Sequence, residues 1–289
     1  MKLPIHPLSQ QRLQDLANNL THATVIYSKH GFGATQAIKE LISTREPEQL
    51  NRIFNNTFER LQHIEPNDKN TIGIEAIKEL EQLVHLAATN DRYVIISQAH
   101  TMTKEAQNAF LKTLEEPPQN MYIFLLVENE NRLLKTIRSR AQPLQILKPT
   151  KQQFTNWLTA EFDLSISAAE KIYYMTEARS ELATQLLDDP EFNTTFTQSQ
   201  QQAKELLSKS AAERLTALAS VVKNVEEVSA ILNHLQIMLS AALRKAGLNN
   251  DPAKAHTWKE KLELVVDLKH ALSQNAQPRL IIDKLVLNL

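Results

Sequence analysis

The sequence contains no cysteine, which excludes disulfide bonds and every zinc site built on thiolates. Its nine histidines are scattered, with none paired at the spacing of a helix face, so we expect no metal site. Only four glycines occur in 289 residues, which favours helices over tight turns. No apolar run approaches the roughly 18 residues of a transmembrane helix, and the N-terminus lacks the apolar core of a signal peptide. We therefore expect a cytoplasmic protein.

A net charge of either sign is also missing. The chain has 32 basic and 33 acidic residues, a formal net charge of −1. Proteins that hold nucleic acid over a broad surface carry a clear excess of positive charge, so any contact with DNA must be local. What the chain does have is hydrophobic residues, 42% of the total, enough to bury a large core in two or three domains.

The most informative stretch runs from Arg92 to Gln142. The apolar run 93–96, three of whose four residues are β-branched, is too short for a globular helix and predicts a buried strand. Thr103 is placed to cap a helix that reaches Leu114, and a second strand is expected at 121–127. A strand, helix and strand of these lengths form a parallel crossover unit, and a basic segment follows it.

Before this stretch, apolar spacing predicts a first helix with Ser9 as its N-cap and a strand at 23–27. The polar segment 46–61 has a helical pattern. After Pro149 the pattern is helical to the end, beginning with a helix capped by Thr150. Apolar residues repeat at helical spacing from Val225 to Leu239, and a stripe of this width needs a partner face.

A loop with glycines joins the strand at 23–27 to the next helix. A phosphate-binding loop has the form G-x-x-x-x-G-K-[ST], in which the lysine meets the phosphates of a nucleotide. Here Ser28 stands at the first glycine and Ala34 at the lysine, while Gly33 and Thr35 match. We favour the simpler interpretation, a strand-to-helix turn in which Gly31 and Gly33 supply permissive backbone.

Two motifs in order carry a resemblance to a known family. The run from Thr103 to Pro118, followed by a strand and Thr136-Ile-Arg-Ser-Arg-Ala141, resembles the AAA+ module of bacterial DNA polymerase III clamp-loader subunits, in particular the delta-prime type. The resemblance implies an α/β plus all-α fold. Its parts would be an AAA+ α/β domain with a parallel sheet at 1–148, a helical lid at 149–190 and a helical oligomerisation (collar) domain at 191–289.

The resemblance also assigns roles to residues. In the family, acidic residues after the strand at 93–96 hold Mg²⁺ and activate water, and here Ser97 and Gln98 occupy those positions. We therefore expect no bound nucleotide and no catalysis by this chain alone. Ser139-Arg140 matches a Ser-Arg-Cys motif whose arginine reaches the ATP of a neighbouring subunit, and Ala141 replaces the cysteine. The implied role of Arg140 is a trans-acting arginine finger.

The implied function is an ATPase-inactive subunit that acts as stator and finger donor while the sliding clamp is loaded onto primed DNA in replication. Its partners would be the motor (gamma/tau) and delta subunits, which belong with it to the DNA polymerase III holoenzyme, a DNA-directed DNA polymerase. ATP would be bound by the partners. Two alternatives stay open: a motor-type subunit that binds nucleotide by unfamiliar contacts, although no Gly-Lys-Thr or Gly-Lys-Ser occurs, and an AAA+-derived scaffold outside replication.

Overall fold

The computed structural model describes residues 3–29, 31–84, 90–128, 130–210, 213–214, 225–274 and 276–289. The chain forms two compact units. The first contains residues 1–173 together with 178–182, and the second contains residues 174–177 together with 183–289. The domain boundaries expected at residues 148 and 190 stay predictions.

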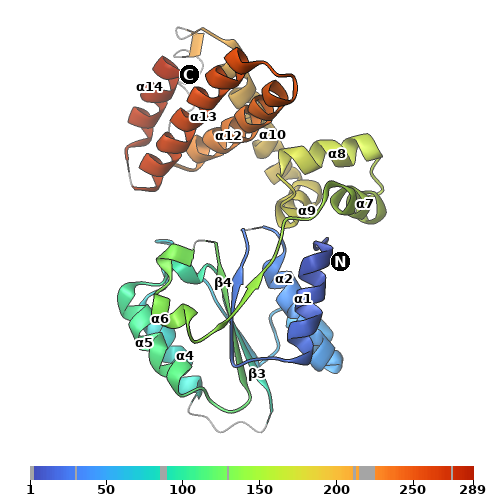
Figure 1. The fold of residues 1–289 in the computed structure, drawn as a ribbon, viewed down its shortest axis with the longest axis vertical. Helices are drawn as coiled ribbons and strands as arrows, with labels where there is room; N and C mark the ends of the chain where they lie inside the picture. The colour runs from blue at the N-terminus through green and yellow to red at the C-terminus, as the bar shows by residue number, and fades with distance from the viewer. Residues whose placement is uncertain are drawn as a thin grey trace. The chain divides into compact units, whose positions relative to one another are not determined.

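A parallel sheet forms the centre of the first unit (Figure 1). Its five strands, in the described part of the chain, have the order β2-β3-β4-β1-β5. They are β1 (Ala23–Tyr27), β2 (Leu61–Ile64), β3 (Arg92–Ile96), β4 (Met121–Val127) and β5 (Gln142–Gln145). The strands predicted at 23–27, 93–96 and 121–127 are confirmed, and so is the α/β class. Strand β5 was not predicted, because only one of its four residues is buried and the second is a proline.

Helices cover both faces of this sheet (Figure 1). One face packs against α4 (Ile74–Val84), α5 (Lys104–Glu115) and α6 (Lys135–Arg138). The other packs against α1 (Pro7–Asn18), α2 (Ala34–Arg45) and the short α3 (Leu50–Phe54). Successive side chains of a strand point to opposite faces, so Val94 and Ile96 lie in one core and Tyr93 and Ile95 in the other. Burial on both faces explains why the strands are continuously apolar.

The helix starts were predicted with mixed success. Thr103 caps α5, because its side chain accepts a hydrogen bond from the Ala106 N–H at 3.2 Å. The expectation for Ser9 is wrong: His6 caps α1, and the buried Ser9 hydroxyl accepts from the Leu147 N–H at 2.8 Å. The helix expected over 46–61 is also wrong in part. It is a 3-10 turn (Pro47–Gln49) followed by α3, which ends before Asn56 in the left-handed region.

Three further helices follow the sheet in sequence. They are α7 (Lys151–Phe162), α8 (Ile166–Met175) and α9 (Ser180–Asp188). Thr150 begins α7 with a capping box, in which its hydroxyl accepts from the Gln153 N–H at 3.2 Å and the Gln153 side chain accepts from the Thr150 N–H at 3.1 Å. The predicted cap is therefore confirmed.

The second unit is helical. It contains α10 (Pro190–Ser208), α12 (Val225–Leu248), α13 (Pro252–Ser273) and α14 (Pro278–Asn288). The buried part of the α12 stripe, with Val228 and Leu239 at its ends, packs in one core with residues of α10, α13 and α14. The stripe thus finds its partner faces inside this unit, while Val225 is 47% exposed. The helical pattern after Pro149 also predicts a helix at 211–222, most of which lies outside the described residues. None of the helices that the structure describes is both long and apolar enough to cross a bilayer.

Tyr93, at the start of β3, gives a testable consequence of this packing. Its side chain is buried, which raises the pKa of the phenol to about 12, even though a hydrogen bond with Arg45 acts in the opposite direction. The folded-state pKa lies above the unfolded value of about 10, so the stability that depends on the neutral phenol is present below pH 10 and is lost as the pH rises through 12.

We expect an absorbance titration to show Tyr93 ionising near pH 12, and urea-unfolding stability to fall as the pH rises from 10 to 12. Tyr93→Phe should remove the late step of the absorbance titration. Tyr174→Phe, a substitution at an exposed tyrosine, is the control and should leave the late step in place. A late step that persists in Tyr93→Phe contradicts the assignment.

Candidate functional site

The glycine loop and the strand ends meet in one cavity of about 260 Å³. The cavity lies where the carboxyl ends of β1, β3 and β4 come together, which is the usual ligand position in parallel sheets. Its lining residues are Ser28, Lys29, Gly31, Ala34, Thr35, His63, Glu65, Ser97, Gln98, Leu126, Val127, Glu128 and Glu181. The structure therefore brings together the positions of the degenerate loop and the two positions that are acidic in active relatives.

The loop has the backbone of a strand-to-helix turn. The Ser28 N–H donates to the carbonyl of Val127 at 3.0 Å, which extends the sheet by one bond. Gly31 and Gly33 both lie in the left-handed region, with φ of +84° and +77°, and Gly33 is the N-cap of α2. Ala34 begins the helix with a methyl group where a working loop presents an ammonium group. At the position of the phosphate-binding lysine, this loop therefore presents only backbone and a methyl group.

Ser97 forms a hydrogen bond with His63, a residue that was not predicted to belong to the site. Its Oγ lies 2.8 Å from the Nε2 of His63, at the end of β2, and the same nitrogen lies 3.6 Å from a carboxylate oxygen of Glu65. Burial lowers the pKa of His63, and nearby Lys39 acts in the same direction, whereas Glu65 raises it. Because neither Ser97 nor Gln98 carries a carboxylate, these positions cannot supply the Mg²⁺ ligand and general base of an ATPase.

The charges that line the cavity are mostly negative. Glu65, Glu128 and Glu181 line it together with a single lysine, Lys29, among the described residues. A nucleoside triphosphate is itself strongly negative, and sites that bind it place cationic groups and backbone N–H donors around the phosphates. The electrostatics of this cavity oppose such a ligand.

Arg140 is not among the residues that line this cavity. It lies in the turn after α6, where its Nη2 forms an ion pair with Glu115 at 2.9 Å and its Nη1 donates to the carbonyl of Thr136 at 3.2 Å. The Ser139 hydroxyl also donates to the Thr136 carbonyl, at 3.1 Å. The Arg140 side chain is 38% exposed, so its guanidinium is open to a partner. Ala141 is buried in the core beside α6, and its replacement of cysteine therefore changes packing rather than charge.

Gln107 in α5 holds the loop that precedes α6, a role that sequence reasoning did not detect. Its amide nitrogen donates to the carbonyls of Met102 and Arg132, both at 3.1 Å, and its amide oxygen accepts from the Leu134 N–H at 2.8 Å. A polar residue on the buried face of a predicted helix was the available signal. The amide fixes the chain shortly before the Arg140 turn.

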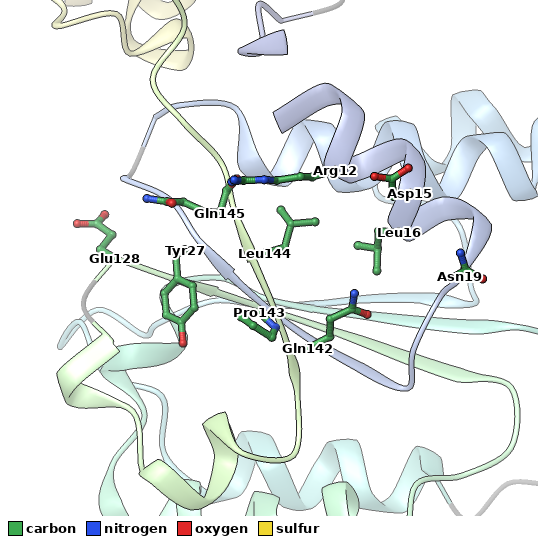
Figure 2. Close-up of a pocket in the computed structure, with 10 residues that line it drawn as sticks. All are labelled: Arg12, Asp15, Leu16, Asn19, Tyr27, Glu128, Gln142, Pro143, Leu144 and Gln145. Carbon is green, nitrogen blue, oxygen red and sulfur yellow. The ribbon is translucent and has the colours of Figure 1, made fainter. Parts of the chain in front are cut away.

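A larger, open groove of about 910 Å³ follows the edge strand β5 beneath α1 (Figure 2). Because the Ile146 N–H bonds to Tyr27 of β1, the backbone groups of Pro143 and Gln145 face outward. Pro143 has no N–H to offer, and Arg12 of α1 already donates to the Gln145 carbonyl at 3.3 Å. Both features protect the edge against addition of another strand, so we assign no binding site to this groove.

The sheet order, the glycine loop after β1 and the helices that follow are those of the AAA+ fold. The fold is similar to that of a solved DNA polymerase III gamma subunit-related protein from Thermotoga maritima, with a TM-score of 0.54 at 16% identity, over 95% of this chain and 97% of that chain.

Sequence comparisons match the first half of the chain to subunits of DNA polymerase III. Residues 8–150 match the family described as "DNA polymerase III, delta subunit". The chain is 30% identical over 179 residues to the DNA polymerase III subunit delta' of Escherichia coli, which is 61% of this chain and 52% of that protein. It is also 30% identical over 126 residues to subunit delta' of Haemophilus influenzae, 43% of this chain and 37% of that protein. The N-terminal half of this chain is thus similar to DNA polymerase III delta' subunits, and its matches span about half or less of those relatives' length.

Proposed function

We propose that this protein is an ATPase-inactive clamp-loader subunit that serves as a stator and donates Arg140 to the ATP site of a neighbouring motor subunit. In this role it assembles with the gamma/tau and delta subunits in the cytoplasm, and the assembly loads the sliding clamp onto primed DNA. The energy comes from ATP bound by the partners. The proposal rests on the resemblance to the delta-prime subunits, on the residues that line the cavity and on the exposed side chain of Arg140.

The observation that carries the proposal is the content of the cavity. Ala34 replaces the phosphate-binding lysine, Ser97 replaces the metal-organising carboxylate, and carboxylates line the space instead. These changes act on different parts of a nucleotide, since the lysine meets the phosphates and the carboxylate organises Mg²⁺. Their combination favours a subunit that holds no nucleotide over a motor-type subunit.

The exposed guanidinium of Arg140 supports the second half of the proposal. In phosphoryl transfer, negative charge spreads over the oxygens of the γ-phosphoryl group, and a planar, permanently charged guanidinium stabilises it. Arg140 does not line the cavity of its own chain, which supports its assignment to the ATP site of another subunit. The family motif Ser139-Arg140 at this turn gives the same assignment.

We expect calorimetric titration of the isolated chain with Mg²⁺–ATP to give no saturable binding, because Ala34 stands at the position of the phosphate-binding lysine and Ser97 at that of the metal-organising carboxylate. The purified chain should also show no ATP turnover. A motor subunit of the same organism, titrated in parallel, is the positive control. Saturable binding by the isolated chain would favour the motor-type alternative.

We further expect the chain to co-purify stoichiometrically with the motor and delta subunits when the three are expressed together, because the proposed stator acts only within that assembly. A variant at an exposed residue of the first unit, such as Lys69→Ala, checks that the purification tolerates small changes. Absence of a complex under conditions where the motor and delta subunits assemble with each other would favour a scaffold outside replication.

A further inference from the structure

The glycine loop is in contact with residues 178–182, which are distant in sequence but belong to the same compact unit. The carbonyl of Gly31 accepts a hydrogen bond from the Glu181 N–H at 3.3 Å and a second one from the Ser180 hydroxyl at 3.5 Å. The Glu181 residue also lines the cavity beside the loop. The loop backbone is thus bonded to its own chain.

The position of Glu181 makes the first of these bonds important. Helix α9 begins at Ser180, so Glu181 is its second residue. The first N–H groups of a helix have no acceptor inside the helix and must find one elsewhere. The Gly31 carbonyl supplies that acceptor for Glu181. In relatives that bind nucleotide, this loop donates N–H groups to phosphate. In this chain, a carbonyl of the same loop accepts a hydrogen bond from the N-terminus of α9.

The approach of the two segments also explains the glycine at position 31. A Cβ atom placed on Gly31 would lie 3.0, 3.2 and 3.3 Å from the Cβ, Cγ and Cδ atoms of Arg179. The aliphatic stem of Arg179 therefore packs directly on the loop. A Cβ on Gly33 would instead meet Leu3 at 3.1 Å and the Ser180 hydroxyl only at 3.6 Å, an ordinary contact.

The segment is held firmly enough to keep an unfavourable backbone. Ala178 lies in the left-handed region with φ of 62°, a conformation that residues with a Cβ avoid. Ala178 and Ser180 are both fully buried. A strained conformation of this kind persists only where the surroundings determine it, and the described surroundings of this segment include the glycine loop.

We propose that residues 178–182 form an intramolecular strap fastened to the glycine loop, so that the Gly31 carbonyl caps helix α9 and the protein's own chain holds the loop in place. This fastening is separate from the loss of the lysine and the carboxylates. The strap also gives Gly31 a role that is independent of phosphate binding. A glycine at this position allows Arg179 to approach closely, and it allows the left-handed backbone conformation of residue 31.

Amide hydrogen exchange, followed by NMR on the full chain, tests the strap. In the native chain we expect the Glu181 amide to exchange at least about 10-fold more slowly than in an unfolded peptide, although amides at helix starts are normally unprotected. Gly31→Ala should speed this exchange about 10-fold, since the new Cβ collides with Arg179. Gly33→Ala is the matched control, with a similar φ but no contact with Arg179, and should change it by less than about threefold.

A second pair of variants keeps the test valid if Gly31→Ala does not fold. Arg179→Lys retains the Cβ, Cγ and Cδ atoms that touch the loop and should leave the Glu181 amide protected. Arg179→Gly removes them and should speed its exchange. The strap is overturned if the native Glu181 amide exchanges as in an unfolded peptide, or if the two members of either pair have equal effects.

Discussion

Arg140→Ala is expected to abolish most of the ATP turnover at the one motor site that this subunit would face in a reconstituted clamp loader. Arginine fingers in well-studied systems contribute about 10³- to 10⁵-fold to the rate of phosphoryl transfer. The measurement is ATP turnover by the complete assembly with clamp and primed DNA, with this chain as wild type or variant. Total ATP turnover by the assembly will fall less than turnover at that one site, because the other motor sites also hydrolyse ATP.

The physical reason lies in the shape of the guanidinium group, so Arg140→Lys should restore little. A lysine carries the same charge but lacks the planar fork that matches phosphoryl oxygens with two donors. Assembly should be unaffected in both variants, since the Arg140 side chain is 38% exposed and contributes no core packing. Size-exclusion chromatography of each complex verifies this.

Glu115→Gln provides the matched control. It removes the charge that pairs with Arg140, but an ion pair at this exposure is worth at most about 1 kcal/mol, so turnover should change by less than about fivefold. If Arg140→Ala leaves turnover unchanged in an intact complex, the finger assignment is wrong. If Glu115→Gln has as large an effect as Arg140→Ala, the ion pair rather than the finger is what matters.

The central strands could be predicted from sequence because burial on both faces makes them continuously apolar. Strand β4, with six of its seven residues buried, has an unmistakable pattern. Strand β5 has no such signal, since it lies at the edge and pairs only with β1. Ser9 was misassigned because serine is a common N-cap residue and histidine a rarer one. The Ser9 hydroxyl instead accepts from the N–H of Leu147, which lies 138 residues away in sequence.

The losses in the nucleotide site were visible in the sequence because each falls at a fixed position in a motif, as at Ala34 and Ser97. What replaced them was not visible. The pairing of His63 with Ser97 joins two strands 34 residues apart, and the bond from Glu181 to Gly31 joins segments 150 residues apart. Such contacts depend on how distant segments pack, which periodicity and motif spacing do not encode.

Gln107→Ala is expected to be the most destabilising polar substitution in the α5 region, by about 3 kcal/mol or more of unfolding free energy, since each buried group left without a partner costs about 1–3 kcal/mol. Three backbone groups, the carbonyls of Met102 and Arg132 and the Leu134 N–H, lose their partners at once. Urea unfolding followed by circular dichroism measures the change.

Asn108→Ala is the matched control, because it removes an amide from the next residue of the same helix, where the side chain is exposed, and should change stability by less than about 0.5 kcal/mol. Gln107→Glu separates size from hydrogen bonding: the carboxylate can still accept from Leu134 but cannot donate to the two carbonyls, so most of the loss should persist. Equal stability of Gln107→Ala and Asn108→Ala would show that the loop before α6 does not depend on this amide.

A destabilised Gln107 variant that still assembles should also lower turnover in the complex, because the turn that carries Arg140 follows directly from the loop that Gln107 holds.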